Sequence, residues 1–332
     1  MQTGLILVIL LVCASIFVNG WTDAPNALTT VVSTRVLTPR KAVILAAIFN
    51  LLGVLLMGTA VAKTISNIIE LTPGTDGLIT LAAAQLAIVI WSVGAWRFGI
   101  PTSESHALIA GLTGAALAGG GIASVSWAEW QKVLLGLGIS SVLGFVTGGL
   151  FTSVIAKLFR NVNRHKANKI FSIGQLVSAS AMAFSHGAQD GQKFMGVLVF
   201  ALSLGGVAMP GGENFIPWYV MVFCSVLMAI GTSVGGYRII KTMGLDMVKI
   251  EKYQGFSAEI AASACMLAAT AFGIPLSTTN TKGTAIMGAA AARRLSNVNW
   301  GIVKEMVTAW VLTFPACGLI GYVMALLLHA IF

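Results

Sequence analysis

The stretch that decides the fold lies near the start of the chain and reads Gly20-Trp21-Thr22-Asp23-Ala24-Pro25-Asn26. Apolar sequence precedes it at 5–18 and follows it at 27–37. An ionised aspartate at bilayer depth costs about 2.5–3.5 kcal/mol on insertion scales, and such residues usually face a cavity or an ion path. The glycine and the proline favour a helix break that leaves backbone groups available to a ligand. The simpler interpretation is that Asp23 caps the helix that begins at Pro25.

A second copy of this pattern argues against a simple cap. His186-Gly187-Ala188-Gln189-Asp190-Gly191-Gln192-Lys193 again places a glycine three residues before an aspartate, and Asp190 follows Asp23 at a spacing of 167 residues. Another pair follows at a spacing of 174: Phe98-Gly99-Ile100-Pro101-Thr102-Ser103-Glu104-Ser105-His106 matches Phe272-Gly273-Ile274-Pro275-Leu276-Ser277-Thr278-Thr279-Asn280. Two sets of motifs in one order predict two homologous halves, 1–157 and 170–332, joined by a linker at 158–169.

The composition places both halves in a membrane. Hydrophobic residues make up 57% of the 332 residues and charged residues only 9%, whereas soluble domains carry about 25% charged residues. The net charge of +9 is explained by Lys and Arg in cytoplasmic loops rather than by nucleic-acid binding. The four cysteines sit singly in apolar runs, so we expect packing roles for them. The N-terminus lacks a basic signal-peptide region, so we expect the first membrane helix to start near Leu5.

We therefore predict an all-α polytopic membrane protein with about 10–12 transmembrane segments, some of them half-helices. At about 20 apolar residues per span, the expected helices are 4–34 (broken), 42–65, 78–98, 104–119, 131–157, 170–206 (broken at Asp190), 217–240, 256–273, 279–292 and 301–331.

Loop charge predicts how the halves are oriented. Loops rich in Lys and Arg are 35–41, 157–169, 238–252 and 293–304, and loops poor in them are 66–77, 119–130 and 205–217, the last carrying Glu213. Loops at matching positions of the two halves have opposite character, so by the positive-inside rule the halves insert in opposite senses and the central loop is cytoplasmic. The loops 66–77 and 119–130 then share a side, which requires a helical hairpin with its tip at 101–105, mirrored by one at 275–279. Inverted repeats with broken helices are typical of secondary transporters.

The hairpin tips offer an anion site. Each tip sets a proline and several hydroxyls at a helix start, where free N–H groups and a partial positive charge favour anions. Two tips that converge from opposite sides would suit a tetrahedral oxyanion. The expected ligands are Ser103, Ser105, Ser277, Thr278 and Thr279. The same hydroxyls also fit ordinary N-caps.

The carboxylates predict the coupling ions. Asp23 and Asp190 cannot attract an anion, so cations or protons must lie between them and the substrate, and a Na⁺ site at these two residues is expected. Glu104 and Glu259 are further candidates, although Glu104 also fits a cap. Asn26 adds a neutral amide at the first motif, whereas Lys193 stands at its counterpart and fits either substrate contact or neutralisation of Asp190. Both His106 and His186 adjoin the site.

At these residues the sequence resembles the inorganic phosphate transporter (PiT) family, whose members carry a duplicated G-A-N-D-x-x-N-A signature and a duplicated P-x-S-T-T-H hairpin. The likeness covers nearly the whole chain. It implies phosphate symport driven by Na⁺ or H⁺, with the signature aspartates and the hairpin hydroxyls at the site, and a homodimer. The chain departs from the pattern at Thr22, Gln189 and Lys193, and Asn50 stands where many members have a glutamate.

The expected function is import of inorganic phosphate by cation symport across a cell membrane through alternating access. Na⁺ is favoured over H⁺ because clustered carboxylate, amide and hydroxyl oxygens suit it. The alternatives are an H⁺-coupled symporter, a sulfate or other oxyanion permease, and a passive anion channel, which the acidic residues disfavour. An enzyme acting on a lipid phosphate is not expected, because the sequence shows neither a Ser-His-Asp arrangement nor an HExxH motif. No cofactor is expected.

Overall fold

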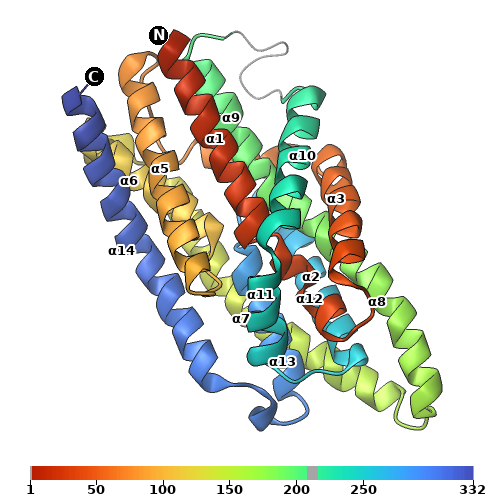
Figure 1. Cartoon of the computed structure of the whole chain (residues 1–332). Helices are drawn as coiled ribbons and strands as arrows, with labels where there is room; N and C mark the ends of the chain where they lie inside the picture. The colour runs from red at the N-terminus through yellow and green to blue at the C-terminus, as the bar shows by residue number, and fades with distance from the viewer. Residues whose placement is uncertain (1, 208–215, 332) are drawn as a thin grey trace.

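The computed structural model describes residues 2–207 and 216–331, so most of the expected loop 205–217, including Glu213, lies outside the described residues. The described chain is nearly all helical, and its β-pairing is confined to two isolated bridges. Figure 1 shows a bundle of steeply inclined helices with both ends of the chain at the same end of the molecule.

The first half contains seven α-helices and a short 3₁₀ turn: α1 (Gln2–Thr22), α2 (Pro25–Ser33), α3 (Pro39–Leu56), α4 (Ala60–Ser66), α5 (Thr75–Arg97), α6 (Glu104–Gly120), η1 (Ile122–Ser124) and α7 (Trp127–Leu158). The second half repeats this order: α8 (Arg164–His186), η2 (Gly187–Gly191), α9 (Gln192–Leu204), α10 (Trp218–Gly235), α11 (Tyr237–Lys241), η3 (Thr242–Asp246), α12 (Lys252–Ala271), α13 (Thr278–Ala291), η4 (Leu295–Asn297) and α14 (Trp300–Ile331).

Both expected hairpins are present, and each is closed at its base in the same way. The pairs α5–α6 and α12–α13 are joined by short tips at 98–103 and 272–277. An antiparallel bridge between Ile69 and Val125 closes the base of the first hairpin, and one between Val248 and Val298 closes the second. The matching details support the predicted duplication, while the domain limits stay a prediction.

Close helix contacts between the halves are reciprocal. A Cβ on Gly20 of α1 would lie 2.0 Å from the Met228 carbonyl oxygen of α10, and one on Gly187 would lie 2.1 Å from that of Asn50 in α3. In the same reciprocal manner, a Cβ on Gly114 of α6 would lie 1.9 Å from a carbonyl oxygen of α14, and one on Gly288 of α13 would lie 2.0 Å from a carbonyl oxygen of α7. Such distances admit no side chain, so glycine permits the backbones to approach as membrane helices do at small residues. Each half therefore packs its first helix, its hairpin and its last helix on the other half.

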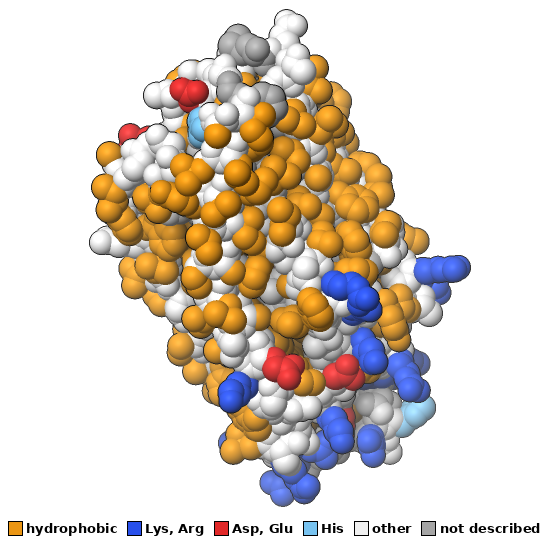
Figure 2. Space-filling view, turned by 60° about the vertical axis from the view of Figure 1, so that its left-hand side comes forward, with side chains coloured by type: hydrophobic (Ala, Val, Ile, Leu, Met, Phe, Trp, Pro, Cys, Tyr) orange, Lys and Arg blue, Asp and Glu red, His pale blue; other side chains and the backbone are white. Residues whose placement is uncertain are grey.

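Apolar side chains form the belt expected of a membrane protein. Among the described residues, five helical segments are long and apolar enough to cross a bilayer, or six when the pair Trp218–Val234 and Tyr237–Asp246, bent by 64°, is counted as one span. The expected ten to twelve segments include half-helices, and α6, α9 and α13, with 17, 13 and 14 residues, are shorter than a full span. Figure 2 shows hydrophobic side chains over the middle of one face, with Lys and Arg gathered toward the lower end.

Two local details differ from the sequence expectation. The expected helix 42–65 is two helices, because Gly58 adopts a φ of +75° between α3 and α4. At Asp190 the chain does not open into a loop but passes through one π-helical turn, η2, between α8 and α9. Such single π turns inside helices are frequent at functional sites. The break at Asp23, by contrast, is a turn between α1 and α2.

Candidate functional site

The tips of the two hairpins touch each other in the protein interior. Ser105 Oγ donates a hydrogen bond to the Leu276 carbonyl oxygen at 3.1 Å, and Thr279 Oγ1 lies 3.1 Å from the Thr102 carbonyl oxygen. All four residues are buried. The tips are therefore closed on each other, and a substrate between them requires their separation.

Ser103 and Ser277 begin the two inner helices as N-caps. Ser103 Oγ accepts from the His106 backbone N–H at 3.3 Å, and Ser277 Oγ accepts from that of Asn280 at 3.1 Å. Ser277 also donates its own proton to the Asn280 carboxamide oxygen at 3.0 Å. The capping role weighed from the sequence is thus present at both tips, and only Ser103 keeps an uncommitted hydroxyl proton among the described contacts.

The first motif leaves buried oxygen atoms unpaired. Asp23 Oδ1 accepts from Asn26 Nδ2 and from Thr279 Oγ1, both at 2.6 Å. Asp23 Oδ2 and Asn26 Oδ1 have no hydrogen-bond partner among the described residues, although both side chains are fully buried. Buried polar atoms are nearly always paired, so these two acceptors point to a ligand.

The second motif is saturated by a lysine. Lys193 Nζ lies 2.5 Å from Asp190 Oδ1, 2.6 Å from Ser105 Oγ and 2.5 Å from the Leu276 carbonyl oxygen. Asp190 Oδ2 accepts from Thr278 Oγ1 at 2.8 Å. Lys193 is 1% exposed, so its ammonium lies wholly inside the protein. Here both carboxylate oxygens have partners.

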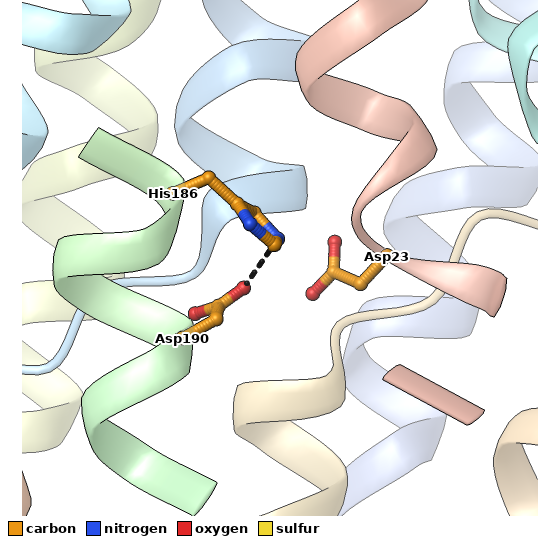
Figure 3. A group of neighbouring side chains, drawn as sticks. All are labelled: Asp23, His186 and Asp190. Carbon is orange, nitrogen blue, oxygen red and sulfur yellow. Dashed lines mark ion pairs between the residues drawn. The ribbon is translucent and has the colours of Figure 1, made fainter. Parts of the chain in front are cut away.

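Figure 3 shows the carboxylates of Asp23 and Asp190 pointing toward each other, with the His186 imidazole beside them. One ligand atom each from Asp23, His186 and Asp190 lies within 4.8 Å of the others, and all three residues are buried. His186 Nε2 is 3.2 Å from Asp190 Oδ2, and its Nδ1 is 3.3 Å from Asn50 Oδ1. Two carboxylates so close together repel each other unless a cation or a proton lies near them, and the Lys193 ammonium supplies one positive charge beside Asp190.

Comparison with known proteins assigns the chain to a family. The model of the phosphate transporter family matches residues 19–321. The chain belongs to the phosphate transporter family. It is a transporter rather than an enzyme.

Individual relatives agree over full length. The chain is 38% identical to a probable low-affinity inorganic phosphate transporter of Bacillus subtilis, covering 100% of both chains. It is 41% identical to one of the same description from Rhizobium meliloti, over 92% of this chain and 90% of that one. A solved structure described as the sodium-dependent phosphate transporter shares the fold with a TM-score of 0.88, covering 99% of this chain and all of the other at 22% identity.

In this transporter the two expected glutamates lie outside the aspartate group. Glu104, the first residue of α6, accepts from Thr22 Oγ1 at 2.6 Å. Glu259 of α12 is hydrogen-bonded to Thr30 and Ser178, and it lies 3.5 Å from Lys282 Nζ in a fully buried ion pair. The geometry joins neither glutamate to Asp23 or Asp190 by a described hydrogen bond or ion pair.

Several positioning residues were not found from the sequence. Gln189 donates to the Ile274 carbonyl oxygen and accepts from the Leu276 N–H, so it fixes the second tip. Gln192 accepts from the Val61 N–H at the gap between α3 and α4. Lys282 was overlooked, although a lysine in an apolar helix is itself a signal of function or of a buried partner.

Proposed function

We propose that the protein imports inorganic phosphate by symport with Na⁺ through alternating access. The observation that carries the proposal is the buried group of Asp23, His186 and Asp190 at the meeting point of two hairpin tips, in a chain of the phosphate transporter family. The sodium-dependent neighbour with the same fold supports the choice of cation.

Phosphate would bind between the separated tips. Its ligands would be the hydroxyls of Ser103, Ser105, Ser277, Thr278 and Thr279, together with Asn26 and Lys193. The helix starts of α6 and α13 add free N–H groups and partial positive charge. Lys193 would supply the fixed positive charge that an anion near two aspartates needs.

The coupling cation would bind beside Asp23. Asp23 Oδ2 and Asn26 Oδ1 are neighbouring buried acceptors that have no partner among the described residues, and the Asp190 carboxylate lies on the facing side. Carboxylate and amide oxygens are hard ligands, and half-helix ends and unwound backbone bind Na⁺ or H⁺ in other transporters. Glu104 and Glu259 would act as more distant carboxylates that a second cation or proton could reach.

The arrangement of the halves supports alternating access. Figure 1 shows α1 starting at the upper end and its counterpart α8 starting at the lower end, as the inverted-repeat proposal requires. Each hairpin packs on the last helix of the opposite half, the first on α14 and the second on α7, so the two halves have similar contacts. A rocking motion of one half against the other could therefore open the site to one side of the membrane and close it to the other. The basic loops, including 158–169, would face the cytoplasm of a cell-membrane protein, and the resemblance supports a homodimer.

H⁺ coupling is the second candidate, and His186 is the observation that favours it. Its imidazole lies 3.2 Å from Asp190 Oδ2 in the centre of the site, and an imidazole can serve as a proton shuttle.

Uptake of labelled phosphate into proteoliposomes decides between these functions. A Na⁺ gradient imposed at equal pH should drive accumulation against the phosphate gradient, and sulfate should not compete. Accumulation with a pH gradient alone and no response to Na⁺ would instead establish H⁺ coupling. Uptake that never exceeds equilibrium would refute symport.

A further inference from the structure

The two motif copies differ in one residue that changes the charge of the site. Three residues after its aspartate, the first copy has Asn26 and the second has Lys193. Asn26 leaves its own oxygen and one oxygen of Asp23 unpaired, whereas Lys193 leaves neither oxygen of Asp190 unpaired. The two copies therefore occupy equivalent positions, but the second carries a positive side chain next to its aspartate and the first does not.

The surroundings of the Lys193 ammonium have the chemistry of a cation site. Its three oxygen neighbours are a carboxylate, a hydroxyl and a main-chain carbonyl, at 2.5–2.6 Å. An ammonium carries three donors, so these three oxygens match it fully. The carbonyl belongs to Leu276 in the non-helical tip of the second hairpin, and unwound carbonyls of this kind hold coupling cations in transporters built on repeats.

The cage also joins the parts that must separate during transport. Asp190 lies in the π turn between α8 and α9, Ser105 lies in the first turn of the inner helix of the first hairpin, and Leu276 lies at the tip of the second. A positive charge held by all three closes both tips over the site. A transporter that needs a cation to close this junction would otherwise have to take that cation from solution.

We propose that Lys193 is a tethered replacement for a coupling cation, so that this transporter takes one cation fewer from solution per phosphate than its duplicated motif would otherwise require. The inference deepens the proposed function and rests on it. Asp23 and Asn26 remain the site for the cation that is transported, and Lys193 stays with the protein through the cycle.

The substitution K193N tests the proposal because it gives the second copy the residue found in the first. The caged oxygens of Asp190, Ser105 and Leu276 then need a cation from solution. In proteoliposomes, we expect the ratio of labelled Na⁺ to labelled phosphate taken up to rise by about one, with a steeper dependence of uptake on Na⁺ concentration. Lys132→Asn is the matched control, because Lys132 is 55% exposed and pairs with Glu129 at the surface, and its ratio should equal that of the wild type.

A binding measurement keeps the test decisive if K193N does not transport. The thermal unfolding midpoint of the purified protein is measured against Na⁺, Li⁺ and methylammonium, for the wild type, K193N and Lys193→Ala. A cation bound only by the folded state raises the midpoint. We expect at least one of these cations to stabilise the two variants more than it stabilises the wild type or Lys132→Asn.

The proposal would be overturned if K193N transports with the same ratio of Na⁺ to phosphate as the wild type. It would also be overturned if no cation stabilises the Lys193 variants more than it stabilises the wild type. The proposed function fails separately: wild-type protein that accumulates no phosphate under either gradient would refute symport, while the gain in cation binding by K193N would still be decided by thermal unfolding.

Discussion

The motif around Asp23 and the motif around Asp190 occupy the same position in the two halves, but their oxygen atoms differ in whether they have hydrogen-bond partners. Around Asp23 the chain turns between two helices, and two buried oxygens remain without a hydrogen-bond partner. Around Asp190 the chain stays helical through a π turn, and Lys193 and Thr278 occupy both carboxylate oxygens. One duplicated scaffold can thus hold an exchangeable ion on one side and a permanent charge on the other.

The difference shows why a repeat alone does not determine coupling. The reciprocal glycine contacts fix where the two aspartates lie, because they set the distances between helices of opposite halves. In the proposal made above, one side chain then decides whether a position takes its cation from solution. Substitutions at equivalent positions of the two copies can therefore test the account.

The largest expected effect is at Asp190. Asp190→Asn leaves the Lys193 ammonium buried without its anion, which should lower the free energy of unfolding by about 3–5 kcal/mol. Asp23→Asn leaves no lysine unpaired and should cost about 1 kcal/mol, although both variants should lose cation-driven uptake. Unfolding in denaturing detergent measures the difference. Equal losses of stability in the two variants would contradict the asymmetry.

A second comparison sets the pair Glu259–Lys282 against its counterparts in the first half, Gln85 and Leu108. Lys282→Met leaves a buried carboxylate with only Thr30 and Ser178 as donors, and should cost about 3 kcal/mol. Gln85→Leu removes a buried amide that has no partner among the described residues, so it should be neutral or stabilise by about 1 kcal/mol. The double variant Glu259→Gln/Lys282→Met should recover most of the loss. If the double variant is as unstable as Lys282→Met, loss of the ion pair is not the cause of the instability.

Where the two copies make the same contacts, equivalent substitutions should lower the free energy of unfolding by similar amounts. Gly20→Ala and Gly187→Ala each place a methyl group about 2 Å from a backbone carbonyl oxygen of the opposite half. Overpacking of this kind costs about 1–3 kcal/mol, so we expect similar falls in unfolding temperature. A tolerated alanine at one position, with a damaging one at the other, would show that the two interfaces are not equivalent.

The smallest effect distinguishes capping from substrate binding. Ser103→Ala and Ser277→Ala each remove an N-cap and should cost about 1 kcal/mol of stability. Ser103 keeps a hydroxyl proton for phosphate, whereas Ser277 donates its proton to Asn280. The KM for phosphate should therefore rise more in Ser103→Ala. The opposite order would assign the substrate contact to the second tip.

The sequence predicted the helical membrane class, both hairpins and the phosphate transporter family, because apolar runs and duplicated motifs are visible without coordinates. It also selected Asp23 and Asp190, which the fold brings together at the tips. It did not predict the π turn at Asp190 or the division of the helix 42–65, since both depend on local backbone geometry and on contacts such as that of Gln192 with Val61. The cage around Lys193 could not be foreseen, because two of its three oxygens come from hairpins distant in sequence.

The most direct test of the account is a structure of the phosphate-bound protein in Tl⁺, a monovalent cation whose anomalous scattering marks its position. We expect one Tl⁺ beside Asp23, Asn26 and Asp190, with the Lys193 ammonium still paired with Asp190 after the tips have separated around phosphate. No Tl⁺ beside Asp23, or a second Tl⁺ that displaces Lys193 from its cage, would contradict the account.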